Sequence, residues 1–376
     1  MKPLIVFLRL FLAILFLGWT LTALPVAATA SSAMPASKFD KFTPRPSTTT
    51  RLDFERMDLL LKGSVLFTGP SLRERAPRLE PYTGTRIVKK HRSPYRLEGN
   101  KIVYSLFSPG QEKLIGEYLI ELERLPSEIE LVSLPKNDQL AYWFNLHNLA
   151  LIHEISKSYP VHRPKDIKPV RGSKAKLHDA KILKVDGVAL SLRDIRENIV
   201  YKNWKNPIVI YGFHDGTLGS PGLPAIAFER DNVSRTLEVN AVEFVNSLRG
   251  FEEDKVSSFF KDVSPFYFPN FESDIRKHLR VYMRDGVYSE LEATAKLKFH
   301  RPIDIIADTT GGYGKYGAPN NLYSNSQSAN MGVSPSVVEY MRENNTKIRK
   351  LIDKGLFSYG TVTIEDIETT DPADVD

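Results

Sequence analysis

The chain has 376 residues, of which 42% are hydrophobic, so it is long enough to bury an ordinary apolar core. It contains no cysteine, which excludes disulfide-stapled folds, thiolate metal sites and thiol nucleophiles. The formal net charge of +6 is mild and does not by itself indicate nucleic-acid binding.

The first thirty residues have the organisation of a secretion signal. Positive charge comes first, then an uninterrupted apolar run at residues 10–17, then a stretch of small residues. Ala28-Thr29-Ala30 fits the A-x-A cleavage pattern, which predicts Ser31 as the mature N-terminus and a periplasmic or extracellular location. The alternative is a membrane anchor formed by an uncleaved signal, because residues 4–24 are about long enough to span a bilayer. A lipid anchor at the cleavage point would need a cysteine and is therefore excluded.

Composition divides the rest of the chain into a linker, a main domain and a tail. Residues 31–50 are rich in Ser, Thr, Pro and Ala, which predicts a flexible linker. Apolar periodicity over residues 51–310 predicts one main globular domain. Beyond residue 310 we expect a flexible tail rich in Gly, Asn and Ser, with one amphipathic helix at 335–351 and an acidic end.

Short helices and strands are mixed within the main domain. Because they do not alternate as regular βαβ units, we expect an α+β fold with a small, partly antiparallel sheet. Asp186-Gly187 is a two-residue hairpin signal between two of the strands. The predicted helices cover 52–61, 111–125, 137–158, 191–200 and 231–248, and the predicted strands cover 101–107, 181–185, 188–190 and 207–211.

The helix predicted at 137–158 is apolar around nearly its whole circumference, which is typical of a buried helix. Its few polar side chains therefore need partners, because an unpaired buried amide or imidazole costs free energy. Asn145 and Asn148 share one face of this helix, and Trp143 and His147 share another. These four residues either bond to neighbouring backbone or line a ligand-binding cleft.

The loop at residues 213–224 follows a predicted strand and carries the most reactive side chains of the domain. Asp215 is a candidate for ligand binding, and Ser220 with a nearby histidine is a candidate for catalysis. A serine nucleophile needs a base and an oxyanion site, however, and the G-x-S-x-G elbow is missing here. The alternatives are a turn-rich loop with an exposed histidine, and a hydrolase in which Ser220 uses His214 or His147 as its base.

The histidines do not form a pattern typical of a metal site. His147 and His153 are six residues apart on one helix, too far around it to chelate a single ion. Neither a Walker loop nor a G-x-G-x-x-G motif follows a strand. We therefore expect no metal and no cofactor.

Charge is unevenly distributed along the chain. Basic residues are concentrated in segments 86–96 and 165–184, whereas acidic residues predominate after Thr361. One interpretation is solvated loops with a solubilising tail. The other is that the basic segments bind anionic envelope polymers or lipid headgroups, with the acidic tail competing for them. A nucleic-acid partner is not expected, and no membrane span should remain after cleavage of the signal.

Several motifs, taken in order, resemble those of the domain of unknown function 547 (DUF547) family. They extend over about residues 95–260. The family typically shows Trp-x-Asn-x-Tyr-Asn on a long helix, then a hairpin and helix start, an Asp-Pro pair and a Phe-hydrophobic-Asn element. The corresponding stretches here are 141–148 with Tyr159-Pro160, then 185–195 with Arg196 in place of the usual Glu, then Asn206-Pro207, then Phe244-Val245-Asn246.

The resemblance also implies what this chain lacks. Typical members carry His in the strand after the Asp-Pro pair, and Cys in a following Ser-Cys-Pro stretch. Here these positions are Ile210 and Ser220, and His147 replaces the family's Tyr on the long helix. Any thiol chemistry in the family would therefore be lost in this chain. We expect a non-catalytic ligand- or partner-binding protein of the cell envelope, with the Ser220 hydrolase as the alternative.

Overall fold

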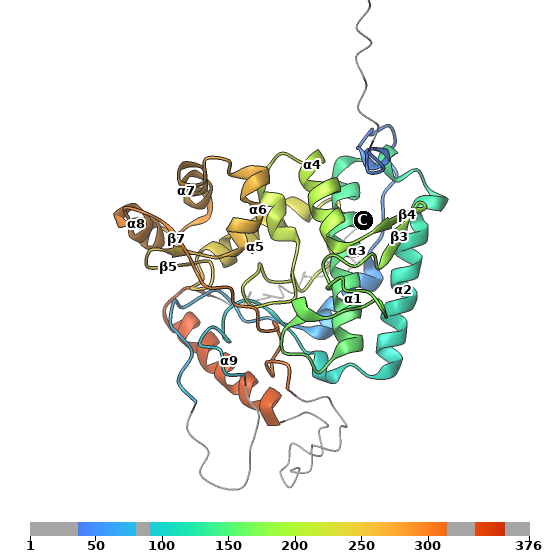
Figure 1. Ribbon diagram of the computed structural model, residues 1–376. Coiled ribbons are helices and arrows are strands. Elements are labelled where there is room, and N and C mark those ends of the chain that lie inside the picture. The colour runs from blue at the N-terminus through green and yellow to red at the C-terminus, as the bar shows by residue number, and fades with distance from the viewer. Residues whose placement is uncertain (1–36, 80–90, 314–334, 358–376) are drawn as a thin grey trace, which may run out of the picture. The chain divides into compact units, whose positions relative to one another are not determined.

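The computed structural model describes residues 37–79, 91–313 and 335–357 (Figure 1). Those from Lys38 onward belong to one compact unit. The predicted signal at 1–30 and the acidic residues after Thr361 lie outside the described residues, as do residues 86–90 of the first basic segment. No helix in the described ranges is both long and apolar enough to cross a membrane.

Helices dominate the secondary structure and the strands are short, which confirms the α+β prediction. The helices are α1 (Glu55–Ser64), α2 (Pro109–Glu128), α3 (Lys136–Ser158), α4 (Tyr201–Asn203), α5 (Val233–Val245), α6 (Phe259–Tyr267), α7 (Phe271–Tyr282), α8 (Asp285–Ala293) and α9 (Pro335–Asp353). The strands are β1 (Val65–Leu66), β2 (Lys101–Ile102), β3 (Leu183–Val185), β4 (Val188–Leu190), β5 (Phe251–Glu252), β6 (Lys255–Val256) and β7 (Lys298–Phe299). They form the pairs β1-β2 and β3-β4 and the three-stranded sheet β5-β6-β7.

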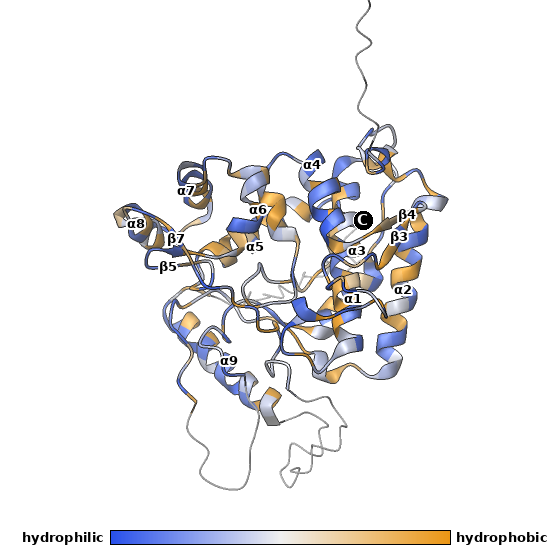
Figure 2. Cartoon of the chain, in the orientation of Figure 1, coloured by the Kyte–Doolittle hydropathy of each residue, from blue (hydrophilic) through white to orange (hydrophobic). Residues whose placement is uncertain are grey.

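Helix α3 is buried around nearly its whole circumference, as predicted. Pro135 stands directly before it and Asp138 lies in its first turn, both of which favour a helix start. Helix α2 packs along α3, where the Tyr142 hydroxyl donates to the Leu122 carbonyl at 2.9 Å. In Figure 2, α2 carries both hydrophilic and hydrophobic residues, as expected of a helix with one face in solvent. The core of the unit therefore forms around α3.

The predicted hairpin at Asp186-Gly187 is confirmed. Strands β3 and β4 pair antiparallel with Val185 opposite Val188. Asp186 and Gly187 both have positive φ, of 44° and 78°, as a type I′ turn requires. The predicted helix start at Ser191 is also confirmed: its hydroxyl accepts from the Asp194 amide at 3.1 Å, and the Asp194 carboxylate accepts from the Ser191 amide at 2.8 Å.

Two predicted strands are wrong in whole or in part. Residues Pro207–Gly212 form a 3₁₀ helix rather than a strand. Proline at its first position and the Asn206 side chain, which accepts from the Ile208 amide, favour a helical turn here. Of the strand predicted at 101–107, only Lys101–Ile102 is extended, and a 3₁₀ turn follows. A short buried apolar run has no period that separates strand from helix, so the pattern could not decide.

Part of the predicted linker is packed against the rest of the unit. Phe42 is buried, and its ring lies edge-on to that of Trp143 with 5.2 Å between centroids. The Arg45 amide donates to the Val132 carbonyl at 2.8 Å. This segment therefore closes one side of α3.

Helix α9 packs on the unit through polar as well as apolar groups. The Tyr340 hydroxyl donates to the Arg96 carbonyl at 3.0 Å. The Arg96 guanidinium in turn pairs in a bidentate manner with Glu343, at 2.8 and 2.6 Å. Because Arg96 is only 3% exposed, this member of the basic segment is not available to a surface partner.

Candidate functional site

The loop at 213–224 is fixed from the α3 side by amide side chains. Asn148 donates to the Gly212 carbonyl at 3.0 Å and accepts from the His214 amide at 3.3 Å. Asn145 makes a reciprocal pair with the Phe228 backbone, at 2.8 and 3.1 Å. Both amides therefore bond to neighbouring backbone, which was one of the two interpretations of the helix.

Ser220 and His214 lie together, but the serine hydroxyl is occupied. Ser220 is 1% exposed, and its hydroxyl donates to the Thr217 carbonyl at 3.0 Å and accepts from the Asp215 amide at 3.2 Å. It also lies 3.1 Å from His214 Nδ1. That nitrogen is 2.8 Å from the Pro221 carbonyl, which can only accept. Nδ1 must therefore carry the proton and cannot accept one from Ser220.

His147 and Trp143 are completely buried within α3. His147 Nδ1 lies 3.1 Å from the Asn148 side-chain oxygen, so Nδ1 is the donor, while Nε2 has no partner among the described residues. Burial, reinforced by the charge of Arg196, holds the pKa of His147 well below its usual range. The imidazole is thus neutral, and no described hydrogen bond joins it to Ser220. Trp143 packs edge-on against Tyr142, at 5.0 Å between ring centroids.

Asp215 forms an ion pair with Lys165 at 2.9 Å. It also accepts from the Thr217 amide and hydroxyl at 2.9 and 2.7 Å. Burial opposes ionisation of this carboxyl, but the Lys165 charge and these hydrogen bonds outweigh it and hold its pKa below the usual range. The backbone carbonyl of Asp215 lies 3.2 Å from His178 Nε2. Both the carboxylate and the backbone carbonyl of Asp215 are therefore occupied by contacts within the fold.

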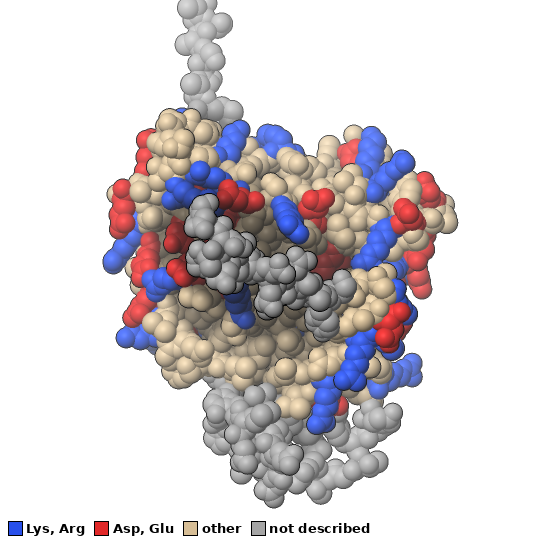
Figure 3. Space-filling view, turned by 180° about the vertical axis from the view of Figure 1, so that it is seen from behind, with Lys and Arg blue, Asp and Glu red and all other residues tan. Residues whose placement is uncertain are grey.

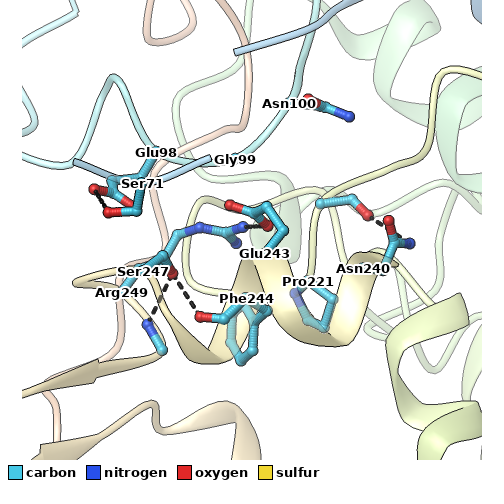
Figure 4. Close-up of polar contacts among 12 residues, drawn as sticks. Ser71, Glu98, Gly99, Asn100, Pro221, Asn240, Glu243, Phe244, Ser247 and Arg249 are labelled. Carbon is cyan, nitrogen blue, oxygen red and sulfur yellow. Dashed lines mark hydrogen bonds and ion pairs between the residues drawn. The ribbon is translucent and has the colours of Figure 1, made fainter. Parts of the chain in front are cut away.

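A buried guanidinium holds later residues of the same loop (Figure 4). Arg249 is 1% exposed and donates to the carbonyls of Leu218 and Ser220. It also pairs with the carboxylate of Glu243 on α5. A Cβ at Gly99 would lie 2.6 Å from its Nη2, so only glycine leaves room for the guanidinium there. Arg249 therefore joins the loop to α5 and to the segment before β2.

Further charges are buried close to Arg249. Lys101 is fully buried and donates to the carbonyls of Glu98 and Gly99. Lys347 of α9 donates to the Leu97 carbonyl at 2.7 Å. The Glu98 carboxylate accepts from the Ser71 hydroxyl at 2.7 Å, as Figure 4 shows, and burial raises its pKa.

Sequence reasoning did not find this group of charges. Its members are spread from Glu98 to Lys347, so no local spacing connects them. Arg249 stands just past a predicted helix end, where a basic residue is ordinary. Within the described ranges, no group of three or more His, Asp or Glu residues is placed to hold a metal ion.

A solvent-accessible cleft lies elsewhere, between the second half of α2 and the segment that leads into α1. Its volume is about 690 Å³. Arg56 lies over the Tyr118 ring at 4.7 Å and pairs with Glu121. All three residues line the cleft. None of the residues predicted from the sequence as site residues lines this cleft. Its lining residues are Thr50, Arg51, Leu52, Asp53, Glu55, Arg56, Tyr118, Glu121, Leu122, Arg124, Leu125, Glu128 and Ile129.

Residues 131–245 match the family described as "Protein of unknown function, DUF547". This segment is DUF547-like. It runs from just before α3 to the end of α5, so it contains His147, His214 and Ser220, whereas Arg249 and α9 lie outside it. No curated protein and no solved structure matches the chain.

Replacing Arg249 by Met should destabilise the protein by about 3–5 kcal/mol, because Glu243 loses its partner beside the DUF547-like loop. The double variant Arg249→Met/Glu243→Leu should recover part of that loss, since no charge is then left unpaired. Urea unfolding followed by circular dichroism measures both effects.

The matched control is Arg193→Gln, which removes an exposed arginine paired with Asp179 and Glu197. It should change the free energy of unfolding by at most about 1 kcal/mol. A double variant no more stable than Arg249→Met would show that the unpaired carboxylate is not the cause of the loss.

Acid should weaken the fold through buried histidines. Burial lowers the pKa of His178 to about 3, with help from the Arg196 charge, and burial lowers that of His278 to about 4. Below pH 6.5 these two histidines become protonated in the unfolded chain, whereas in the folded protein they stay neutral down to their lowered pKa values. The free energy of unfolding should therefore fall by about 1.4 kcal/mol per pH unit for each histidine between pH 6.5 and 4.

Unfolding measured between pH 7 and 4 tests this expectation. His278→Gln should reduce the slope, whereas Lys277→Gln, which alters the exposed neighbour on α7 and removes no histidine, should keep it. Equal slopes for His278→Gln and the unmodified protein would contradict the assignment.

Proposed function

We propose that this chain is an exported, non-catalytic binding protein of the cell envelope. The observation that carries the proposal is the state of Ser220, which occupies the position of the cysteine in the resembled family. Its hydroxyl is buried and donates to the Thr217 carbonyl. A buried hydroxyl with no neighbouring base that can take up its proton is a poor nucleophile.

The hydrolase alternative depends on the 3.1 Å contact between Ser220 Oγ and His214 Nδ1. For catalysis, His214 would have to release the Pro221 carbonyl, and Ser220 would have to reach solvent. Arg249 opposes that movement because it holds the Ser220 carbonyl. The contacts around the loop therefore support binding over covalent chemistry.

The cleft between α1 and α2 is the best-supported place for a ligand. Its volume of about 690 Å³ lies in the range of small-molecule sites, roughly 300–1,000 Å³. Its lining combines apolar side chains such as Leu122 and Leu125 with arginines and carboxylates. Such a mixture of apolar surface and a few polar groups is typical of binding pockets.

A fluorophosphonate probe tests the absence of a serine nucleophile. We expect no labelling of the protein above that of Ser220→Ala, because the hydroxyl is enclosed and its proton is donated to backbone. Intact-mass spectrometry measures the adduct, with a commercial serine esterase as the positive control. Stoichiometric labelling that disappears in Ser220→Ala would establish the hydrolase instead.

Export can be tested by expressing the full chain in a Gram-negative bacterium. The protein should be recovered from the periplasmic fraction with Ser31 as its first residue, as N-terminal sequencing would show. Leu12→Arg/Leu15→Arg interrupts the apolar run and should leave the chain uncleaved in the cytoplasm. An unmodified chain that stays uncleaved in the membrane fraction would support the anchor alternative.

A further inference from the structure

The basic segment at 165–184 contains two kinds of cation. One kind is paired with carboxylates of the same unit. Lys165 pairs with Asp215, Lys176 pairs with Asp166 at 2.6 Å, and Lys181 pairs with Asp194. Lys165 is partly buried, whereas Lys176 and Lys181 are exposed, and a carboxylate lies beside each of the three charges.

The other kind is exposed and has no carboxylate partner among the described residues: Lys168, Arg171, Lys174 and Lys184. The first three fall within seven residues, 168–174, which we call the basic turn. On the face shown in Figure 3, basic and acidic side chains are interspersed. The basic turn itself contains three of the exposed cations and no acidic residue.

The basic turn is closed by a backbone hydrogen bond and has an open tip. The Ser173 amide donates to the Val170 carbonyl at 3.1 Å, and Gly172 has a φ of 78°, which closes a tight turn. A Cβ at Gly172 would meet nothing within 4 Å, so the tip faces open space. Ile167 before the turn and Leu177 after it are both buried and anchor its ends. Because the turn is already ordered, binding through it costs little conformational entropy.

An apolar side chain stands among these cations. Val170, which lies between Lys168 and Arg171 in the basic turn, is 42% exposed. A soluble polyanion would be bound by the charges alone and gains nothing from the valine. A membrane surface uses both, because the apolar group enters the interface while the cations approach anionic headgroups.

We propose that the basic turn docks this protein on anionic phospholipid. Val170 enters the headgroup region, and Lys168, Arg171 and Lys174 lie against lipid phosphates. This interaction goes beyond the proposed binding function and does not depend on the cleft or on Ser220. It also replaces the broader expectation that the whole 165–184 segment contacts envelope material.

Sedimentation with lipid vesicles tests the proposal, using the purified chain from Ser31 onward at 0.1 M salt. It should bind vesicles of 30% phosphatidylglycerol in phosphatidylcholine, and not vesicles of pure phosphatidylcholine. Lys168→Gln/Arg171→Gln/Lys174→Gln should lower the partition coefficient roughly 100-fold, since each cation near an anionic surface contributes about five- to sixfold.

The matched control removes the same charge from three exposed cations elsewhere: Lys136→Gln/Arg235→Gln/Lys277→Gln. Circular dichroism checks that both triple variants are folded. The control should bind within about threefold of the unmodified chain, because screening confines the attraction to charges close to the surface. Equal losses in the two triple variants would mean that net charge is responsible, and would overturn the proposal.

Val170→Ser separates a membrane from a soluble polyanion. It should weaken vesicle binding about fivefold and leave heparin binding unchanged, because only the membrane takes up the apolar side chain. If Val170→Ser has no effect on vesicle binding while the basic-turn triple variant loses heparin, the partner is an anionic polymer and the proposal fails. Absence of binding to the phosphatidylglycerol vesicles also overturns it. Neither result bears on the fluorophosphonate experiment.

Discussion

The guanidinium of Arg249 donates to two carbonyls of the 213–224 loop and pairs with Glu243, while almost none of it reaches solvent. A charge in such a position must keep its partners, because an unpaired buried ion costs several kcal/mol. The loop, α5 and the glycine at position 99 are consequently held in one arrangement. Asn148 of α3 holds the start of the loop through the Gly212 carbonyl and the His214 amide.

These contacts also fix how Ser220 lies beside His214: the serine hydroxyl is buried, and His214 Nδ1 carries its proton toward the Pro221 carbonyl. Ser220 and His214 are close enough to hydrogen-bond, yet each already donates to a backbone carbonyl, that of Thr217 and that of Pro221 respectively. A nucleophile needs a base with a free lone pair and a route for the substrate. In the described fold, the loop's polar groups stabilise its shape, and a solvent-accessible cleft lies apart from them, between α1 and α2.

The basic residues of this protein fall into two groups: some form ion pairs within the fold, and others are exposed without a carboxylate partner among the described residues. Arg96 and Lys165 belong to basic stretches of the sequence, but their ion pairs with Glu343 and Asp215 make them part of the fold. The basic turn combines three exposed cations, which have no carboxylate partner among the described residues, with an exposed valine. A count of charges along the chain therefore overstates the surface available to an anionic partner.

The sequence by itself determined the features that depend on local pattern. The apolar circumference of α3, the positive-φ hairpin at Asp186-Gly187 and the helix start at Ser191 follow from near neighbours, and the structure confirms them. The absence of cysteine likewise excluded thiol chemistry without any coordinates. These are properties of spacing and composition, which a single chain displays directly.

Only the tertiary structure decided which polar groups are occupied. Arg96 pairs with Glu343, which follows it by 247 residues in the sequence. Arg249, which comes after α5, donates to the Ser220 carbonyl in the loop. Pro207–Gly212 became a 3₁₀ helix because a buried apolar run fits either conformation, and its surroundings selected one. The availability of a side chain depends on what the fold places against it, and that placement is not encoded in any local period.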